Sequence, residues 1–226
     1  DLDPALNLII GHGSGSFGHV PASRYHTREG VSTADQWRGF AQVHAEAAEL
    51  NQIVSTELRN AGINCLTFDP LSMFVGGDTS HQEAANAVFA MVDKGLVPLV
   101  YGDTILDQVL GGTILSTEEI FTQLATARPQ PSRFLLAGDE PGIWRDFPKK
   151  NDLIKTLDSS LFRQMNVEYI YGAATTDVTG GMRAKVNLAV SLLEKNLGQE
   201  VIIFSGLEPQ NVHKALLGEN PGTRIA

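Results

Sequence analysis

The sequence predicts an α/β protein, a three-layer sandwich in which helices cover both faces of a largely parallel central sheet. Apolar runs of strand length alternate with segments whose apolar residues recur every three or four positions, as in amphipathic helices. Most of these runs are continuously apolar, which is typical of parallel strands buried on both faces. The 226 residues, of which 42% are hydrophobic, suffice for a complete core.

Each predicted strand is a short apolar run, and most end at glycine, serine or aspartate. The predicted strands are Leu6–Ile10, Ile63–Phe68, Leu96–Tyr101, Thr113–Leu115, Arg133–Ala137, Val201–Phe204 and Thr223–Ile225. The predicted helices are Thr33–Ala61, Gln82–Lys94, a helix through Ala127 that Ser116 caps, Met182–Asn196 and Asn211–Leu217. The longest begins at Thr33, a suitable N-cap, and ends at Gly62.

Composition excludes several classes of protein. The net charge is −9 and there is no basic block, so nucleic acid is not an expected partner. No apolar run reaches the roughly 18 residues of a membrane span, and no signal peptide is visible at Asp1, so we expect no membrane insertion. Cys65, the single cysteine, lies in an apolar run and is expected to be a buried thiol. It excludes an intrachain disulfide and fits the cytoplasm.

The most informative segment is the glycine-rich stretch after the first predicted strand, Gly11-His12-Gly13-Ser14-Gly15-Ser16-Phe17-Gly18-His19. Glycine lacks a Cβ and tolerates positive φ, so neighbouring backbone N–H groups can converge on one anion. We therefore interpret the stretch as a phosphate site, with His19 as a side-chain donor to the same anion.

The same residues contain a dinucleotide-binding pattern, Gly13-x-Gly15-x-x-Gly18. That fingerprint requires a helix that starts within the glycines and an acidic residue about 20 positions later. Pro21 follows the glycines at once, and the stretch from Arg24 to Gly30 lacks helical periodicity. Neither Glu29 nor Asp35 ends a second strand. The pattern favours a phosphate loop, with a purely structural glycine turn as the other alternative.

A second anion site is predicted at Asp177-Val178-Thr179-Gly180-Gly181-Met182-Arg183-Ala184-Lys185. Gly180 and Gly181 open the predicted helix, so free N–H groups and the helix dipole favour an anion there. Lys185 lies one turn inside, and its side chain leans back toward the helix start. Gly102-Asp103 and Gly138–Gly142 also follow strands, where ligands of open α/β sheets gather. Two phosphate sites on one sheet indicate a phosphoryl donor and a phosphoryl acceptor.

Across essentially the whole chain, and in order, these motifs resemble those of isopentenyl phosphate kinases in the amino acid kinase superfamily. The resemblance rests on Gly13–His19, Tyr101-Gly102-Asp103, Asp177–Met182 with Lys185, Gly39-Phe40-x-x-Val43 and Glu49-Leu50-Asn51. It implies transfer of the ATP γ-phosphoryl group to isopentenyl phosphate or a related prenyl monophosphate, giving the diphosphate for isoprenoid biosynthesis. Mg²⁺ is expected from the chemistry of ATP rather than from a cluster of ligands. It also implies one amino acid kinase-like domain, with an acceptor-binding lobe over 1–127 and a nucleotide-binding lobe over 128–226. The long helix would form a homodimer.

The resemblance also assigns roles to matching residues. The catalytic residues would be His19, Lys185 and Glu118. The acceptor would be bound by Gly13, Ser14, Gly15, Gly18, His19, Gly102 and Asp103. The nucleotide would be bound by Asp139, Gly142, Ile143, Trp144, Asp177, Thr179, Gly180, Gly181 and Lys185. No protein metal site is expected, because the histidines outside this set are scattered. His12 is expected to be structural, and His26, His44, His81 and His213 to be solvated or capping.

The chain departs from the family pattern in places. Relatives begin with a strand that carries Lys-x-Gly-Gly-Ser and a second lysine, and we expect such a strand to precede Leu6 in the natural protein. Ser14 stands where relatives carry glycine, and Ser116-Thr117-Glu118-Glu119 replaces Ser-Gly-Asp-Asp. Two alternative functions remain open. One is a kinase for another small phosphate or phosphonate such as fosfomycin, and the other is a non-catalytic nucleotide-binding sensor.

Overall fold

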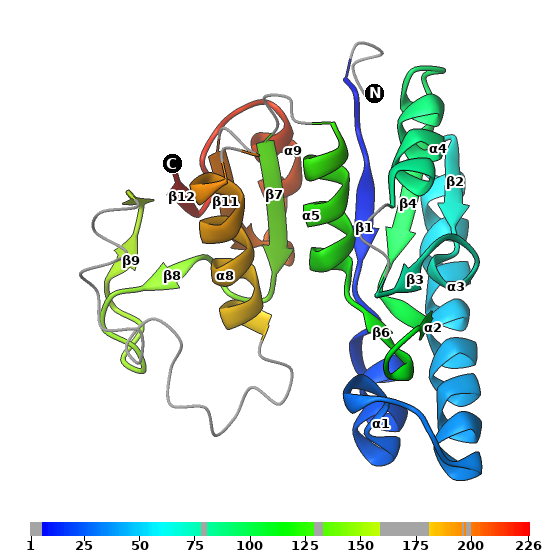
Figure 1. Ribbon diagram of the computed structural model, residues 1–226. Coiled ribbons are helices and arrows are strands. Elements are labelled where there is room, and N and C mark those ends of the chain that lie inside the picture. Colours follow the sequence, from blue (N-terminus) through cyan, green and yellow to red (C-terminus); the bar gives the residue numbers. More distant parts are fainter. Residues whose placement is uncertain (1–5, 78–80, 129–132, 159–180, 196, 198–199) are drawn as a thin grey trace. The chain divides into compact units, whose positions relative to one another are not determined.

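The computed structural model describes residues 6–77, 81–128, 133–158, 181–195, 197 and 200–226. Internal contacts divide the chain into two compact units, Asp1–Ala127 and Arg128–Ala226, each with its own sheets (Figure 1). In both units helices pack on a sheet whose strand pairs are mostly parallel, which confirms the predicted α/β sandwich. Among the described helices, none has both the length and the apolar character needed to cross a bilayer.

The first unit contains a parallel three-stranded sheet in the order β1-β4-β2. These strands are Ile10–His12, Val97–Tyr101 and Cys65–Phe68. A second sheet, β3-β5-β6, consists of Val75–Gly76, Asp103–Asp107 and Gly111–Leu115. The helices are α1 (Gly15–Tyr25), α2 (Ala34–Asn60), α3 (Pro70–Met73), α4 (Gln82–Val92) and α5 (Thr117–Ala127), with a 3-10 turn at Thr27–Glu29.

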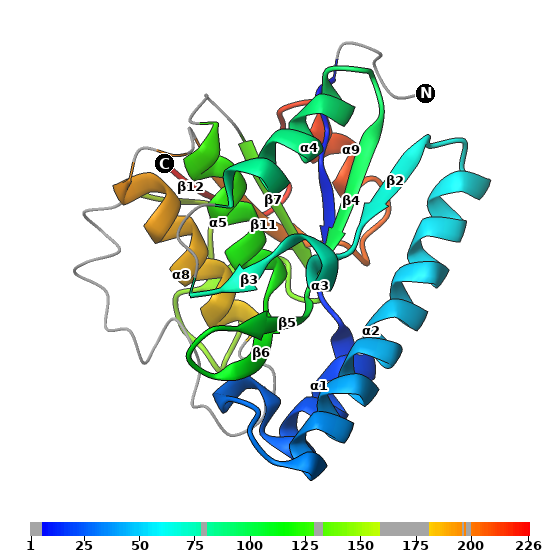
Figure 2. The same ribbon diagram turned by 45° about the vertical axis from the view of Figure 1, so that its right-hand side comes forward.

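Helices cover both faces of the β1-β4-β2 sheet. Leu99 and Val100 are neighbours on β4 and are 0% and 2% exposed, and adjacent strand residues point to opposite faces. Val100 packs in a core cluster with Val88 of α4 and Ile120 of α5. The long helix α2, which contacts β2 and β4 but lies outside this cluster, covers the other face (Figure 2).

The helix ends follow the sequence closely. Thr33 caps α2 through a capping box, in which the Thr33 hydroxyl accepts from the Gln36 N–H and the Gln36 side chain accepts in return. Ser116 and Glu119 form the same reciprocal pair at the start of α5. Gly62, with φ +82°, follows the last residues of α2.

Helix α1 was not expected from the sequence, which predicts a loop there. Pro21 lies inside this helix, where it removes the hydrogen bond to the Phe17 carbonyl. Packing compensates, because α1 lies against α2 and Gly39 leaves room for the Tyr25 ring. A Cβ at position 39 would lie 2.1 Å from Tyr25 Cγ. Tertiary contact therefore overrides a weak local helix signal.

The first strand also differs from its prediction. It spans Ile10–His12 rather than Leu6–Ile10, because its pairing with β4 joins Ile10 to Leu99 and His12 to Tyr101. The first and last residues of β1 are therefore set by its pairing with β4, and not by the extent of the apolar run Leu6–Ile10. The strand therefore leads directly into the glycine-rich segment.

The second unit contains the sheet β10-β12-β11-β7. Its strands are Thr156–Leu157, Thr223–Ile225, Glu200–Ser205 and Arg133–Gly138. A small hairpin pairs β8 (Ile143–Trp144) with β9 (Leu153–Ile154). Helices α8 (Gly181–Glu194) and α9 (Asn211–Leu216) both contact β11. The short strands β3, β5, β8, β9 and β10 were missed from the sequence, because most of them are too short to show a period.

Candidate active site

Three loops meet at one edge of the sheet in the first unit. Strands β1, β4 and β2 run parallel, so Gly13, Gly102 and Asp69 follow them at the same edge. Helix α2 passes this edge and contributes His44 and Asn51, whose side chains contact residues of these strands and loops. The glycine-rich segment, Gly102 and Asp103 are therefore brought together, as the sequence predicts for one ligand site.

The glycine-rich segment forms the N-terminus of α1. Ser14 is the N-cap, with φ −76° and ψ −7°, and Gly15 follows with φ +53°. A right-handed residue followed by a left-handed one makes consecutive N–H groups converge into an anion-binding nest. The Ser14 side chain does not cap the helix, so the first N–H groups of α1 are left for another acceptor. Because the φ of Ser14 is negative, replacing glycine here costs no backbone strain.

Gly18 and His19 lie on the next turn of α1. A Cβ at Gly18 would lie 2.6 Å from both Cβ and Oγ of Ser14, so a side chain does not fit without moving the cap. His19 is exposed, and helical side chains lean toward the N-terminus of their helix. Its imidazole is therefore on the turn above the nest and free to reach an anion held there.

The side chain of Asp103 points into the protein interior and not toward solvent. It is 1% exposed, His44 Nδ1 lies 2.7 Å from its Oδ2, and the Thr104 N–H donates to its Oδ1 at 2.6 Å. Burial raises the pKa of Asp103 to about 6, although the Thr104 hydrogen bond and His44 oppose this shift. The prediction that His44 is solvated or capping was wrong. Asp103 can border an acceptor through its backbone only, since its carboxylate is occupied.

His44, Asp69 and Asp103 offer ligand atoms within 4.8 Å of one another. Their hydrogen bonds account for this grouping without an ion. Asp69 caps α3, accepting from the Leu71 N–H and the Ser72 hydroxyl. The direct contact between His44 and Asp103 leaves no space for an ion between those atoms. Mg²⁺ also prefers carboxylate, carbonyl and water oxygens over an imidazole nitrogen, so the group does not suit that ion.

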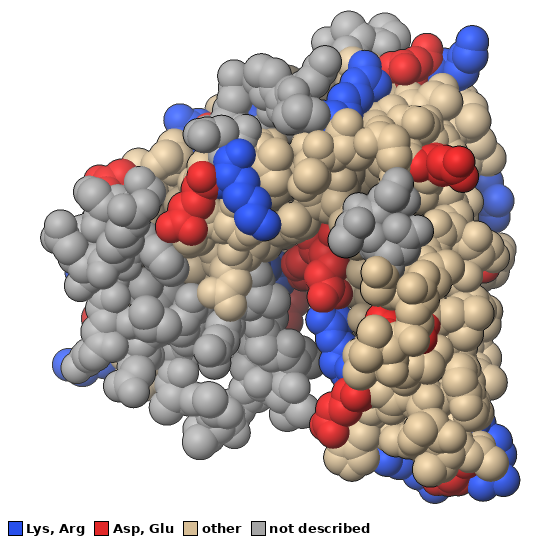
Figure 3. Space-filling model, viewed as in Figure 1, with Lys and Arg blue, Asp and Glu red and all other residues tan. Residues whose placement is uncertain are grey.

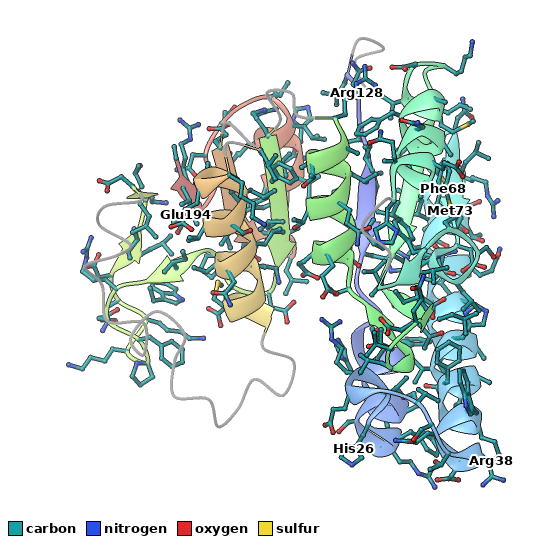
Figure 4. All side chains as sticks on the ribbon, viewed as in Figure 1. His26, Arg38, Phe68, Met73, Arg128 and Glu194 are labelled. Carbon is teal, nitrogen blue, oxygen red and sulfur yellow. The ribbon has the colours of Figure 1, made fainter. Side chains whose placement is uncertain are left out.

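Apolar side chains lie beside the same edge. Phe68 ends β2 and Met73 ends α3, and both are partly exposed while packing against the core that contains Phe74 (Figure 4). Phe74 itself is 4% exposed and belongs to that core. The edge therefore combines an anion-binding nest with partly exposed apolar side chains.

In the second unit, Lys185 lies on the second turn of α8. A Cβ at Gly138 would lie 3.3 Å from both Cε and Nζ of Lys185. The ammonium therefore lies over Gly138, the last residue of β7. Gly181 is the first residue of α8, whereas Asp177, Thr179 and Gly180 lie outside the described residues.

The turn predicted to bind the nucleotide, Asp139–Trp144, packs against the buried residue Thr223. Gly142 has φ +152°, and a Cβ there would lie 2.5 Å from Thr223 Oγ1. Ile143 is 1% exposed and its N–H donates to Thr223 Oγ1 at 2.8 Å, so its side chain belongs to the core. The Trp144 indole donates to Glu140 Oε2 at 2.9 Å. Burial opposes the charge of Glu140, but hydrogen bonds from Lys150 and Trp144 outweigh it and lower the pKa.

Comparisons with known proteins agree with this arrangement. The family model described as the amino acid kinase family matches residues 2–205. This chain belongs to the amino acid kinase family. Within it, the chain is 33% identical to an isopentenyl phosphate kinase of Methanothermobacter thermautotrophicus, over 97% of this chain and 84% of the relative. It is 31% identical to the isopentenyl phosphate kinase of Arabidopsis thaliana, over 94% of this chain and 68% of that relative.

Solved structures give the same family. The crystal structure of an isopentenyl phosphate kinase matches with a TM-score of 0.76 and 26% identity, covering 97% of this chain and 84% of that one. The resemblance of this amino acid kinase to isopentenyl phosphate kinases is thus confirmed.

Two acidic residues of this amino acid kinase have different environments. Glu119 forms the capping box with Ser116, and both of its oxygens accept from the Arg28 guanidinium, at 2.6 and 3.0 Å. The Glu119 carboxylate is therefore fully used by hydrogen bonds at the start of α5. Glu118 is partly exposed on the first turn of the same helix. Of the pair, Glu118 is the one whose carboxylate is available for a catalytic role.

Sequence reasoning did not identify His44 and Asn51 as residues of the site, although Asn51 belongs to a segment that matches the family. Both lie on α2, seven positions apart, so they share one helix face. That face is mostly apolar, with Ala47 buried between them and Val43 buried just before His44. Polar residues within a buried helical stripe were the signal that could have identified them.

Proposed function

We propose that the protein transfers the γ-phosphoryl group of ATP to isopentenyl phosphate or a related prenyl monophosphate. The observation that carries this proposal is the nest at Ser14 and Gly15, with His19 one turn above it and Phe68 and Met73 nearby. The nest suits the phosphate of the acceptor, and the apolar side chains suit its hydrocarbon tail. The identities to isopentenyl phosphate kinases support the same acceptor.

We further propose that the two units form one amino acid kinase-like domain. The first would bind the acceptor through Gly13, Ser14, Gly15, Gly18, His19 and the backbone of Gly102 and Asp103. The second would bind ATP through Asp139, Gly142, Ile143, Trp144, Gly181 and Lys185, together with Asp177, Thr179 and Gly180. ATP would arrive as its Mg²⁺ complex, the form in which kinases use it. For Ile143 the contact would come from its backbone.

The chemistry needs no strong base. An acceptor phosphate oxygen, already anionic at neutral pH, attacks the γ-phosphorus in line, and the bond from that phosphorus to the bridging β-phosphate oxygen breaks as ADP leaves. The N–H groups of the nest and His19 would orient the acceptor. Lys185 would neutralise charge on the transferred group, and Glu118 would orient cationic groups near the phosphates.

Local donors, rather than overall charge, would bind these anions. The protein carries a net charge of −9, and acidic and basic side chains are interspersed on the face drawn in Figure 3. Two anionic substrates therefore gain no long-range attraction from the net charge. Binding would depend on the backbone N–H groups, His19 and Lys185.

We also propose a cytoplasmic homodimer formed through α2 and β2. Ile53 and Leu66 are exposed apolar residues, at 47% and 45%, on these two contacting elements. Cys65 is a buried free thiol, which fits a reducing compartment. Light scattering of the wild type and of Leu66→Lys tests the dimer. A wild-type monomer would contradict the dimer, and an unchanged dimer in the variant would contradict an interface through Leu66.

The decisive experiment measures ADP release from Mg–ATP by the full-length protein. Isopentenyl phosphate, geranyl phosphate and fosfomycin are compared side by side. Turnover with a prenyl phosphate, well above that with fosfomycin, is the expected result. Preference for fosfomycin would favour the phosphonate kinase. ATP binding without turnover of any acceptor would favour the sensor.

A further inference from the structure

We propose that His12 is a positioning residue for the acceptor phosphate, because its ring orients the Gly13–Ser14 peptide so that the Ser14 N–H faces the nest. This inference rests on the proposed function of the nest. It gives His12 a role that differs from that of His19, which would touch the phosphate itself.

The ring of His12 is held from several sides. His12 ends β1 opposite Tyr101, and the two rings stack with centroids 5.6 Å apart and planes 9° from parallel. Nε2 lies 3.2 Å from Oδ1 of Asn51. Asn51 is 8% exposed, and its Nδ2 lies 3.4 Å from Thr67 Oγ1. The orientation of the ring is therefore fixed by β4, α2 and β2 together.

The other ring nitrogen holds the loop. Nδ1 lies 3.0 Å from the carbonyl oxygen of Gly13. A carbonyl oxygen can only accept, so the hydrogen bond requires the proton on Nδ1. In the neutral ring Nε2 is then an acceptor, so it pairs with Asn51 when the amide presents Nδ2 to the ring and Oδ1 to the Thr67 hydroxyl. The Thr117 hydroxyl and the Gly102 N–H meanwhile donate to the backbone carbonyl of His12, at 2.6 and 3.3 Å. Both the ring and the backbone of His12 are thus fixed at the start of the loop.

The position of the Gly13 carbonyl also fixes the direction of the Ser14 N–H, because the two groups belong to the same peptide. The Gly13–Ser14 bond is not among the cis peptides of the described chain, and in a trans peptide the C=O and the N–H point in opposite directions. When His12 draws the Gly13 carbonyl toward its ring, the Ser14 N–H turns to the opposite side. Ser14 is the first of the residues whose right-handed and left-handed conformations build the nest. His12 therefore sets the direction of the first N–H of the nest without touching the anion.

Two substitutions separate the ring nitrogens. His12→Asn retains a donor near the position of Nδ1 and gives up the contact to Asn51. His12→Gln places its amide near the position of Nε2 and gives up the Gly13 contact. Both lose the stacking on Tyr101 equally, so each is a control for the packing of the other.

We expect His12→Gln to raise the KM for isopentenyl phosphate on the order of tenfold, the effect of losing one hydrogen bond of about 1.4 kcal/mol. The KM for ATP and kcat should change little. His12→Asn should keep the acceptor KM within about threefold of wild type, which corresponds to less than 1 kcal/mol. A merely structural role would change both KM values, and would do so equally in the two variants. Either of those results would overturn the proposal.

A titration with inorganic phosphate tests the same point without turnover. In the wild type and in His12→Asn, the amide resonance of Ser14 should move as phosphate binds, and in His12→Gln it should move less. An equal response in both variants would overturn the role of His12. If the wild type binds phosphate but does not use isopentenyl phosphate, the proposed acceptor fails while this comparison still decides the role of His12. A Ser14 resonance that does not respond in the wild type removes the nest, and the role of His12 with it.

Discussion

His44 Nδ1 lies 2.7 Å from Asp103 Oδ2, at the point where α2 passes the carboxyl end of β4. The carboxylate is almost completely buried, and the Thr104 N–H donates to its other oxygen. Asp69 adds a second negative charge nearby and helps to raise the pKa of Asp103. Tyr101, whose pKa is raised by burial and by both aspartates, completes the cluster. Ionising Asp103 in the folded protein is therefore costly.

The first prediction concerns the pH dependence of stability. The pKa of Asp103 is raised from 3.8 to about 6 by burial, so the folded state binds its proton more tightly than the unfolded state does. The resulting stabilisation is fully present below the unfolded pKa and is lost as the pH rises through about 6. At about 1.4 kcal/mol per pH unit, the loss amounts to about 3 kcal/mol.

Asp103→Asn should remove this dependence. An asparagine accepts from the Thr104 N–H and donates to His44, but it does not titrate. Urea unfolding of both proteins, from about pH 4 to about pH 7.5, should show wild type losing stability relative to the variant. Asp35→Asn is the control, because Asp35 is an exposed partner of Arg38. A stability difference that does not vary with pH would contradict the prediction.

The second prediction concerns His19. If it donates to the acceptor phosphate during transfer, His19→Ala should lower kcat on the order of a hundredfold to a thousandfold, as loss of one such donor does elsewhere. ATP affinity should remain, since the nucleotide is assigned to other residues. Steady-state kinetics and ATP binding by calorimetry measure the two effects.

The matched control is His26→Asn. His26 ends the same helix, is exposed, and has φ 52°, a conformation that asparagine tolerates. Its kinetics should equal those of wild type. Unchanged turnover in His19→Ala would remove this residue from the mechanism.

The third prediction compares Gly13 and Gly18, two glycines of the glycine-rich segment on either side of the nest. Within the described part of the chain, no atom beyond the two flanking residues lies within 4 Å of a Cβ built at Gly13, so Gly13→Ala should change the free energy of unfolding by no more than about 0.5 kcal/mol. At Gly18 the Cβ would lie 2.6 Å from Ser14, and overpacking of this kind costs about 1–3 kcal/mol. Both variants should raise the KM for the acceptor, but only Gly18→Ala should unfold more easily. An acceptor KM unaffected by Gly13→Ala would argue against a phosphate beside Gly13.

The parts of the fold with long local patterns could be predicted from the sequence. Helix α2 has a periodic apolar face, a capping box at Thr33 and a glycine after its end. These local features were sufficient to predict where it begins and ends. Helix α1 could not be predicted, because its glycines and Pro21 argue locally for a loop. Packing against α2, including the fit of the Tyr25 ring against Gly39, favours the helix, and these contacts join residues of two different elements.

For the site, the backbone features were more predictable than the side-chain partners. Glycines that follow a strand indicate an anion nest by their own conformational freedom. The pairing of His44 with Asp103, by contrast, joins residues 59 positions apart. It depends on how α2 crosses the end of β4, which no local pattern specifies. The same applies to the hydrogen bonds between Arg28 and Glu119. They occupy the carboxylate of Glu119, whereas the carboxylate of the adjacent Glu118 stays available.

The fourth prediction concerns Lys185, whose ammonium lies over the carboxyl end of β7. Lys185→Met keeps the apolar stem of the side chain as far as Cε and removes the charged terminal nitrogen, so the packing of the stem beside Gly138 should survive. If the charge neutralises the transferred phosphoryl group, kcat should fall on the order of a hundredfold or more. Stopped-flow measurement of a single turnover separates this step from product release.

Two comparisons sharpen this prediction. Lys195→Met removes an exposed lysine just beyond α8 and should leave turnover unchanged. Gly138→Ala would place a methyl group 3.3 Å from both Cε and Nζ of Lys185. Because the end of a lysine side chain can shift by a few tenths of an ångström, kcat should fall far less than in Lys185→Met. Equal single-turnover rates in wild type and Lys185→Met would show that the charge is not used in the transfer. An equally large loss in Lys195→Met would show that general positive charge, rather than this position, supports the rate.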